Sequence, residues 1–311
     1  MPFTQIDEYK VNLFWLMNPD PRDLASASHD NLPPSKPIKE GFPTIVFLHA
    51  AASNICGWSR QLSDPRLANN FNLLAIDCMY NGWTTGGEEG DYTLEDSASV
   101  VVACLDKLEL TEYHLFGEGV HGCVIAAWVA VKRRSCVKSL LIASPGYRQE
   151  APDVLAALAA VQDALLCNKV GRGGDDTGTF PSQPLSDIVA YFIGSLDRLA
   201  GAREEMRIRF QERYGRDQPL HEVKWLFDAV MERKAIPDEL LGEVRCPVLI
   251  LRGSEDTVVS PEHACEEWRR AFSNAAGGAS CHVIAGAPSL ISLSDANIVN
   301  RICTQFCLRA K

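Results

Sequence analysis

The sequence predicts an α/β fold in which a mostly parallel central sheet is flanked by helices. Three observations carry this prediction. Continuous apolar runs such as Pro43–Leu48 and Val137–Ala143 are typical of strands that are buried on both faces. Segments whose apolar residues recur at helical spacing, such as Thr93–Leu108, alternate with these runs. The connections between them are short, and this alternation indicates βαβ units in a parallel sheet.

The composition limits the partners of this chain. It has 311 residues, of which 46% are hydrophobic, and a formal net charge of −10 without any Lys/Arg-rich run. We therefore expect neither a nucleic-acid partner nor a membrane partner. The N-terminal residues Met1–Glu8 carry acids where a signal peptide carries positive charge, and no apolar run is long enough to span a bilayer.

The eleven cysteines are an odd number and are scattered singly along the chain. No CxxC pair and no Cys/His spacing typical of a metal site occurs. Those in apolar periodic segments are interpreted as small core residues. A reducing cytoplasm is the simplest location for such a chain.

The first half of the chain contains most of the expected strands. Tyr9–Leu16 alternates as an edge strand does, and Ser59–Asn69 is predicted to be one helix. Thr93 is an N-cap candidate for the next helix, with Asp96 as its acidic partner three residues later. The buried strands are expected at Pro43–Leu48, Phe71–Asp77, Tyr113–Phe116 and Val137–Ala143.

The pattern changes after residue 146, where helical segments follow one another without strands up to about residue 235. A Gly/Asp/Thr/Pro-rich loop interrupts them at Gly171–Ser182. The expected helices are Asp153–Leu166, Leu185–Gln211 and Leu220–Arg233. The sheet then resumes with Cys246–Gly253, Glu262–Phe272 as a helix, Cys281–Ala285 as the last strand and Asp295–Leu308 as the closing helix.

A glycine-rich corner lies where the strand Tyr113–Phe116 runs into an apolar helix. This stretch resembles the nucleophile elbow of the α/β-hydrolase family, a sharp strand–turn–helix with the pattern Gly-x-nucleophile-x-Gly. In this chain Gly117 is the first glycine, Gly119 stands at the nucleophile position, and His121 stands at the second glycine position. An elbow holds its nucleophile at positive φ, which glycine adopts without cost.

The resemblance implies an α/β-hydrolase fold with a helical cap inserted after the sixth strand. Residues 1–146 and 236–311 are then the core, and residues 147–235 are the cap that roofs the active site. A merely structural insert is the alternative. The overall pattern also resembles hydrolase-like tailoring proteins of fungal natural-product pathways, in which this fold serves ring-forming chemistry in secondary metabolism.

The resemblance also locates the catalytic triad, and two of its three groups are missing. Asp256 follows the strand Cys246–Gly253, where the family places its acid, but Ser289 stands where the family places its histidine. With Gly119 at the nucleophile position, the triad is degenerate. The usual mechanism, in which histidine takes a proton from serine, is therefore not available.

Other groups remain near the elbow. The backbone N–H of Val120, together with that of Ala50 or Ala51, is expected to form an oxyanion hole. Glu118 beside the elbow is a candidate acid or base, because an apolar pocket raises the pKa of a carboxyl group toward neutrality. Asp256 and His121 are further candidates, although His121 also fits a core histidine with a backbone partner.

Three hypotheses follow. The first is a non-hydrolytic enzyme (a cyclase, isomerase, lyase or epoxide-opening catalyst) that acts on a small hydrophobic molecule. The second is a catalytically inactive pseudoenzyme that binds a ligand under its cap. The third is a hydrolase with a relocated nucleophile, such as Cys78 or a water activated by Asp256, with Cys123 as another candidate thiol. No metal or nucleotide cofactor is implied, since the glycines lack the GxGxxG context.

Overall fold

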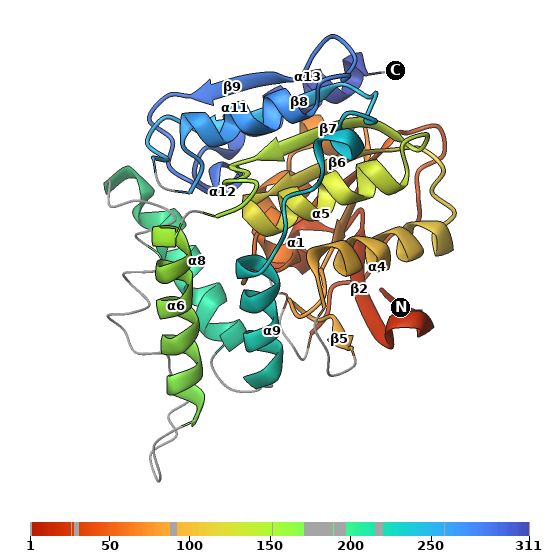
Figure 1. The fold of residues 1–311 in the computed structure, drawn as a ribbon. Coiled ribbons are helices and arrows are strands. Elements are labelled where there is room, and N and C mark those ends of the chain that lie inside the picture. Colours follow the sequence, from red (N-terminus) through yellow and green to blue (C-terminus); the bar gives the residue numbers. More distant parts are fainter. Residues whose placement is uncertain are drawn as a thin grey trace.

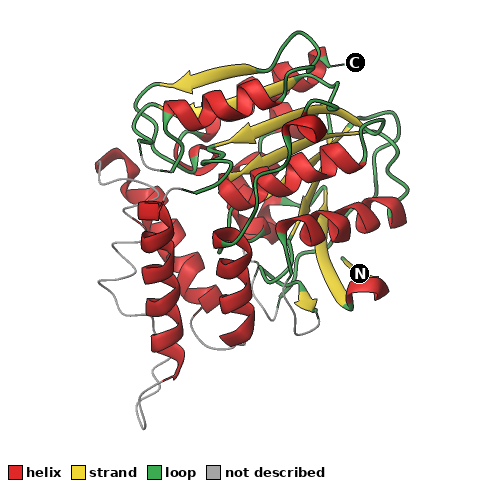
Figure 2. Cartoon of the chain, viewed as in Figure 1, coloured by secondary structure: helices red, strands yellow, loops and turns green. Residues whose placement is uncertain are grey.

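A nine-stranded sheet forms the centre of the molecule, with helices on both of its faces (Figures 1 and 2). The computed structural model describes residues 2–25, 27, 31–87, 92–150, 152–170, 189, 197–214, 220–257 and 259–310. The strand order is β1-β2-β4-β3-β6-β7-β8-β9, with the short β5 paired to β2. The strands are β1 (Phe3–Ile6), β2 (Val11–Met17), β3 (Thr44–Leu48), β4 (Asn72–Ile76), β5 (Thr85–Gly86), β6 (Tyr113–Glu118), β7 (Val137–Ala143), β8 (Val248–Gly253) and β9 (Ser280–Ile284).

The strands from β4 to β9 along this order run parallel, and β1, β2 and β5 pair antiparallel at one end. The predicted α/β fold with a mostly parallel sheet is thereby confirmed. The expected edge position of the strand at Tyr9–Leu16 is wrong. β1 pairs outside β2, with Phe3 opposite Phe14, so β2 is an inner strand. A four-residue strand shows too little alternation to be recognised from the sequence.

The longer helices are mostly where the periodicity predicts them, whereas the 3₁₀ turns and the short helices α1 and α10 were not predicted. The bounds are η1 (Asp7–Tyr9), α1 (Pro21–Ala25), η2 (Ile55–Trp58), α2 (Ser59–Leu62), α3 (Pro65–Ala68), α4 (Leu94–Lys107), α5 (Gly119–Lys132), α6 (Pro152–Val170), η3 (Asp197–Leu199), α8 (Ala200–Tyr214), α9 (Leu220–Met231), α10 (Asp238–Leu241), α11 (Glu262–Ala271), α12 (Ile291–Ser294) and α13 (Ala296–Arg309). The capping box of Thr93 and Asp96 is present at the start of α4.

The prediction of one helix over Ser59–Asn69 is wrong. Two short helices, α2 and α3, occupy the segment, and the break lies at Asp64. The Asp64 side chain accepts a hydrogen bond from Arg66 N, and Pro65 takes the first position of α3, where its missing N–H costs nothing. The short α12 was not predicted either, because four residues give no readable period.

Each face of the sheet has its own hydrophobic core. On one face, α4, α5 and α11 pack over the strands through residues such as Val101, Ile125 and Trp268. On the other, η2, α3 and α13 contribute residues such as Trp58 and Val299. Because both faces are covered, the central strands are apolar at nearly every position, which is the pattern the sequence shows.

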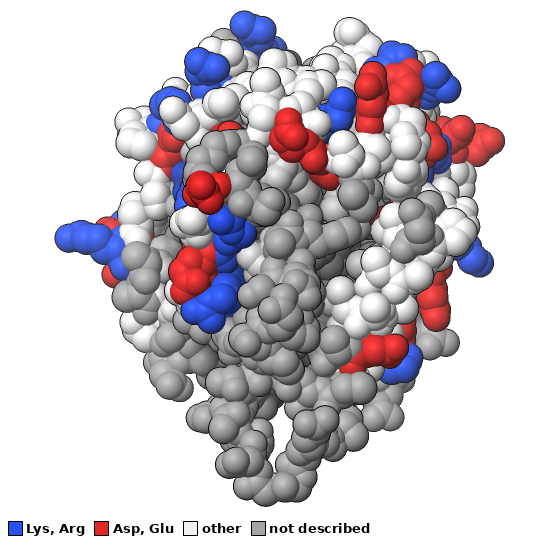
Figure 3. Space-filling model, turned by 90° about the vertical axis from the view of Figure 1, so that its left-hand side faces the viewer, with Lys and Arg blue, Asp and Glu red and all other residues white. Residues whose placement is uncertain are grey.

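The described residues between β7 and β8 form helices and turns. In Figure 1, α6, α8 and α9 lie together near the end of the sheet toward which the arrowheads of the parallel strands point. Gln162 of α6 donates hydrogen bonds to Lys224 O and to Asp228 Oδ1 of α9. The predicted loop Gly171–Ser182 and nearly all of 185–196 in the predicted helix Leu185–Gln211 lie outside the described residues. Acidic and basic side chains are interspersed over the described surface of this side of the molecule (Figure 3).

Candidate functional site

The bend between β6 and α5 is built from glycines that allow close packing. Gly119 begins α5 with a φ of 65°. A Cβ on Gly117 would lie 2.3 Å from Gly122 O, and a Cβ on Gly122 would lie 2.3 Å from Leu48 O. Helix α5 therefore crosses the sheet so closely that neither position accepts a side chain. Helix α5 approaches the backbone of β3 most closely at Gly122, and the neighbouring position 121 has room for the His121 side chain.

Ala50 lies directly against the tip of this bend. A Cβ built on Gly119 would be only 2.8 Å from the Ala50 methyl group. Any side chain at position 119 would thus have to displace Ala50, in addition to adopting a positive φ. The two positions therefore fit each other, and together they leave no room for a side chain at position 119.

Asp256, in the loop after β8, and Ser289, in the loop after β9, lie close to each other. Asp256 follows β8 and is buried, and its Oδ1 accepts hydrogen bonds from Val259 N and Ser260 N, both at 3.0 Å. The Ser289 hydroxyl, and that of Ser144 at the end of β7, lie close enough to lower the pKa of Asp256, but burial outweighs them and raises it. Among the described residues, Asp256 Oδ2 and both hydroxyls lack a hydrogen-bond partner at normal distance.

Glu118, the last residue of β6, is held by α12. Its Oε1 accepts a hydrogen bond from Ser292 N at 2.8 Å, and Oε2 accepts one from Ser292 Oγ. Burial raises the pKa of Glu118 to about 7, although both hydrogen bonds from Ser292 oppose the shift. Leu290, with a φ of 43°, turns the chain into α12 and so brings Ser292 to the carboxyl group. Ser292 lies 174 residues after Glu118, and sequence reasoning missed it.

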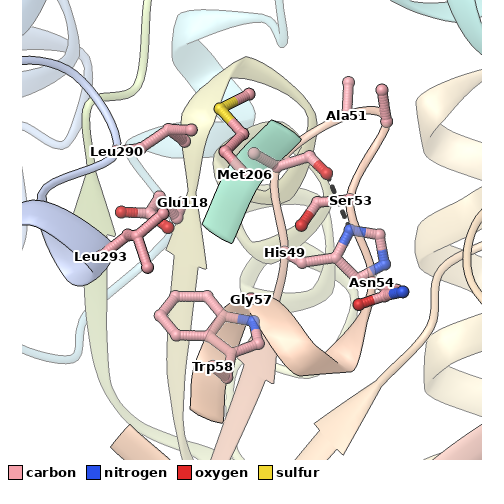
Figure 4. Close-up of a pocket in the computed structure, with 12 residues that line it drawn as sticks. His49, Ala51, Ser53, Asn54, Gly57, Trp58, Glu118, Met206, Leu290 and Leu293 are labelled. Carbon is pink, nitrogen blue, oxygen red and sulfur yellow. Dashed lines mark hydrogen bonds between the residues drawn. The ribbon is translucent and has the colours of Figure 1, made fainter. Parts of the chain in front are cut away.

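Glu118 lines a small cavity of about 40 Å³ with mostly apolar walls (Figure 4). The indole ring of Trp58 forms part of the wall, and its Nε1–H is buried without a hydrogen-bond partner in the described part of the chain. Met206 of α8 reaches in from the helical segment. The lining residues are His49, Ala50, Ala51, Ala52, Ser53, Asn54, Gly57, Trp58, Glu118, Met206, Leu290 and Leu293.

A second cavity, of about 60 Å³, lies over the Gly119 bend. Ala50, Ala51, Met206 and Leu290 line both cavities, so the two spaces adjoin at these residues. The remaining lining residues of the second cavity are Gly119, Val120, Glu150, Val154, Leu158, Val230, Val259 and Ser289.

A sequence model described as the α/β hydrolase fold matches residues 43–295. The chain belongs to the α/β-hydrolase fold family. Among curated proteins, the probable lysophospholipase BODYGUARD 2 of Arabidopsis thaliana is 26% identical over 133 residues, which are 40% of this chain and 28% of that protein. BODYGUARD 1 of the same plant is 28% identical over 108 residues, 33% of this chain and 23% of that protein. The chain thus matches only about a quarter of the length of these relatives.

Solved structures of hydrolases resemble this α/β-hydrolase-fold chain over nearly its whole length. The enol-lactonase from Burkholderia xenovorans has a TM-score of 0.73 at 15% identity, covering 98% of this chain and 99% of that one. A hydrolase from Pseudomonas aeruginosa has a TM-score of 0.72 at 18% identity, covering 98% and 97%. At these identities the likeness concerns the fold and not the reaction.

The three residues whose backbone N–H groups were expected to form an oxyanion hole border the second cavity of this hydrolase-fold chain. Val120 lies in the first turn of α5, where N–H groups have no partner within the helix and the helix dipole favours negative charge. Ala50 and Ala51 border the same cavity from the loop after β3. The carbonyl of Ala50 is turned toward His49, whose Nδ1 lies 2.7 Å from it (Figure 4).

The rings of His49 and His121 are stacked, with their centroids 5.9 Å apart and an angle of 21° between their planes. His49 Nε2 accepts a hydrogen bond from Cys78 N, so its proton is on Nδ1. His121 Nδ1 lies 3.3 Å from His49 O, and burial lowers the pKa of His121 to about 4. His121 is neutral at pH 7, borders neither cavity, and braces the backbone that carries Ala50.

The two thiols considered as relocated nucleophiles are both fully buried. Burial raises the pKa of Cys78 far above its usual range, with the charge of Asp77 acting in the same direction. The Cys123 thiol donates to Gly117 O and Ala143 O, both at 3.3 Å, and its pKa is raised as well. Neither thiol forms an accessible thiolate.

A buried ion pair joins the beginning and the end of the helical segment. Arg233 Nη2 lies 2.6 Å from Glu150 Oε1, with both side chains at most 2% exposed, and Arg233 also donates to Tyr147 O and Val230 O. Glu150 borders the second cavity. Sequence reasoning missed this pair, because the two residues lie 83 positions apart.

The described residues contain no group of three or more His, Cys, Asp or Glu side chains placed to hold a metal ion. Within the same ranges, no helix combines the length and apolar character needed to cross a bilayer.

Proposed function

We propose that this chain is a non-hydrolytic enzyme that acts on a hydrophobic small molecule by acid–base chemistry. Cyclisation, isomerisation, elimination and epoxide opening all belong to this class. The observation that carries the proposal is the buried carboxyl group of Glu118, which lines a mostly apolar cavity and whose pKa is about 7. A group with this pKa is present in both protonation states at neutral pH, which suits a general acid or base.

The groups that hydrolysis requires are absent from the corresponding positions. Gly119 has no nucleophilic atom, and the Ser289 hydroxyl is not basic enough to take a proton from a nucleophile or from water. Among the described residues no imidazole is hydrogen-bonded to Asp256, and one of its oxygens is already bound by two backbone N–H groups. In the proposal, Asp256 holds the loop after β8 in place.

The proposed reaction combines proton transfer with stabilisation of a substrate oxygen. Protonated Glu118 gives its proton to the substrate, or the carboxylate removes one, and Ser292 keeps the carboxyl group oriented. The side chain of Trp58 forms part of the wall of the same cavity. In the adjoining cavity, the N–H groups of Val120 and of Ala50 or Ala51 act as oxyanion donors, each contributing about 3 kcal/mol to a developing negative charge.

The helical segment acts as the cap in this proposal, with residues 147–235 inserted between core segments 1–146 and 236–311. Met206 of α8 borders both cavities, and methionine side chains move readily because they are unbranched. Displacement of Met206 by a substrate would join the two cavities into one site. Glu118 and the N–H donors would then face the same molecule.

The first experiment asks whether the chain turns over a ligand through Glu118. Hydrophobic ketides, lactones and epoxides are screened by thermal shift, and binders are assayed for conversion. Glu118→Gln preserves the shape of the side chain and is expected to reduce kcat/KM at least 100-fold. The control Glu255→Gln removes an exposed carboxyl group and is expected to retain full activity.

Full turnover by a folded Glu118→Gln variant would disprove the role of Glu118. Ligand binding by the wild-type protein without conversion of any binder would instead favour the pseudoenzyme.

A second experiment tests the assignment of the empty triad positions. The wild-type protein is expected to resist a fluorophosphonate probe. Gly119→Ser with Ser289→His rebuilds the nucleophile and the base, and Ala50→Gly makes space for the new side chain. The triple variant is expected to be labelled at position 119 and to hydrolyse activated esters, whereas the double variant without Ala50→Gly is expected to be much weaker. Stoichiometric labelling of the wild-type protein would sink the proposal.

A further inference from the structure

A pair of cysteines lies on the side of the sheet covered by α11. Cys281 is on β9, the last strand of the sheet, and it is exposed. It stands opposite Ile250 of β8, so it shares a face with Ile250 and Arg252. Cys265 lies on α11, which packs against β8 and β9, and it is buried. The pair is thus accessible to solvent from the Cys281 side only.

Cys265 on α11 and Cys281 on the strand face toward α11 lie close enough for each thiol to shift the pKa of the other. The neighbouring Cys265 lowers the pKa of Cys281 to about 7, and the nearby Arg252 acts in the same direction, while partial burial and the carboxylates of Glu262 and Glu266 on α11 oppose the shift. The pKa of Cys265 is raised, so Cys265 remains the protonated partner. An exposed sulfur with thiolate character beside a second thiol has the features of an oxidisable pair.

We propose that Cys265 and Cys281 are a redox modification site, which hydrogen peroxide converts into a disulfide between α11 and β9. The Cys281 thiolate attacks one peroxide oxygen, the O–O bond breaks, and Cys281 sulfenic acid and hydroxide form. The Cys265 sulfur then attacks the Cys281 sulfur, its proton goes to the leaving hydroxyl, and water departs. Peroxide is reduced by two electrons and the two thiols are oxidised by two.

The pair is connected to the candidate site by a short chain of contacts. Cys265 Sγ lies 3.3 Å from Ser260 Oγ, and Ser260 N donates to Asp256 Oδ1. Formation of the disulfide draws the Cys265 sulfur toward β9 and away from Ser260. The loop that carries Asp256 is therefore the part of the site that oxidation reaches first.

A second pair serves as an internal control. Cys303 and Cys307 of α13 are also in contact, but both are fully buried. Peroxide cannot reach them in the folded protein, so they are expected to stay reduced while Cys281 reacts. If proximity of two thiols were sufficient for oxidation, both pairs would be oxidised. If exposure of one thiol is also required, only Cys265 and Cys281 are oxidised.

The test is peptide mapping of the folded full-length protein after graded peroxide treatment and alkylation of the remaining thiols. Trypsin separates Cys265, in the peptide 253–269, from Cys281, in the peptide 271–301. The expected product is the disulfide-linked pair of these two peptides, reversible by dithiothreitol and absent from Cys281→Ser. Cys136→Ser, which alters a half-buried cysteine elsewhere, is expected to leave the yield unchanged.

A second measurement does not depend on the yield of disulfide. The rate of Cys281 alkylation by iodoacetamide is expected to reach half its maximum near pH 7, and Cys265→Ala is expected to move that midpoint upward by at least one pH unit. Two results would overturn the proposal. One is Cys281 oxidised to sulfinic acid with Cys265 still reduced, and the other is a midpoint near pH 9 in the wild-type protein.

Discussion

Two buried carboxyl groups stand at the same end of the parallel sheet, one on the last residue of β6 and one in the loop after β8, but their surroundings differ. Glu118 is held by one residue, Ser292, and borders a cavity with apolar walls. Asp256 is held by the backbone N–H groups of Val259 and Ser260, and it borders neither cavity. Burial raises the pKa of both groups, so a shifted pKa alone does not distinguish a reactive carboxyl from a structural one. In the proposed function, access to a cavity distinguishes Glu118 from Asp256.

The comparison predicts the largest loss of stability at Asp256. Asp256→Ala leaves two buried N–H groups without an acceptor, at about 1–3 kcal/mol each, so the free energy of unfolding is expected to fall by about 4 kcal/mol. Asp256→Asn keeps an acceptor oxygen and is expected to lose about 1 kcal/mol or less. Urea unfolding at pH 7 measures both. Equal losses for the two variants would show that the backbone hydrogen bonds are not what anchors this loop.

A smaller and pH-dependent effect is expected at Glu118. Its folded pKa of about 7 exceeds the ordinary value of 4.5, so the folded state holds the proton more tightly than the unfolded state. The free energy of unfolding therefore falls as the pH rises from about 4.5 to about 7, by about 3 kcal/mol at most. Below pH 4.5 Glu118 is protonated in both states, so its titration no longer changes the free energy of unfolding.

Glu118→Gln removes this titration. Its stability relative to the wild-type protein is expected to increase between pH 4.5 and pH 7.5, and urea unfolding across this range measures the difference. A constant difference between the two proteins would mean that Glu118 is ionised at pH 5 in the folded state. It would then be no better suited to proton transfer than a surface carboxyl group.

The smallest effect is expected at Ser292. Ser292→Ala removes the hydroxyl that donates to Glu118 Oε2 and that lowers its pKa, so the pKa is expected to rise further above 7. The loss of one hydrogen bond costs about 1 kcal/mol. The readout is the midpoint of the stability-versus-pH curve, with Ser294→Ala of the same helix as the control. A downward shift of the midpoint would contradict the assigned role of Ser292.

The periodic and local features of this chain were readable from the sequence. The buried strands β3, β6 and β7 are short apolar runs, the capping box at Thr93 is a local pattern, and the bend at Gly119 follows from the spacing of its glycines. The positive φ of Gly119 is also a local property. These predictions succeed because each depends on neighbours within a few residues along the chain.

Contacts between distant residues were not readable. Ser292 meets Glu118, Arg233 meets Glu150, and Met206 borders two cavities only because the sheet order and the helical segment bring these elements together. The same holds for the Ala50 methyl group against Gly119, which lies 69 positions away in a different loop. No periodicity connects such pairs.

The sequence by itself determined the family scaffold and the glycine at position 119 of the bend, because motif spacing and residue identity are written along the chain. Only the tertiary structure decided that Glu118 lines a cavity and that His121 does not. The close packing of α5 on β3 sets which side chains point inward. The segment after β9 supplies Ser292 as the partner of Glu118. Burial and partners set the protonation of a carboxyl group, and both are properties of the folded chain.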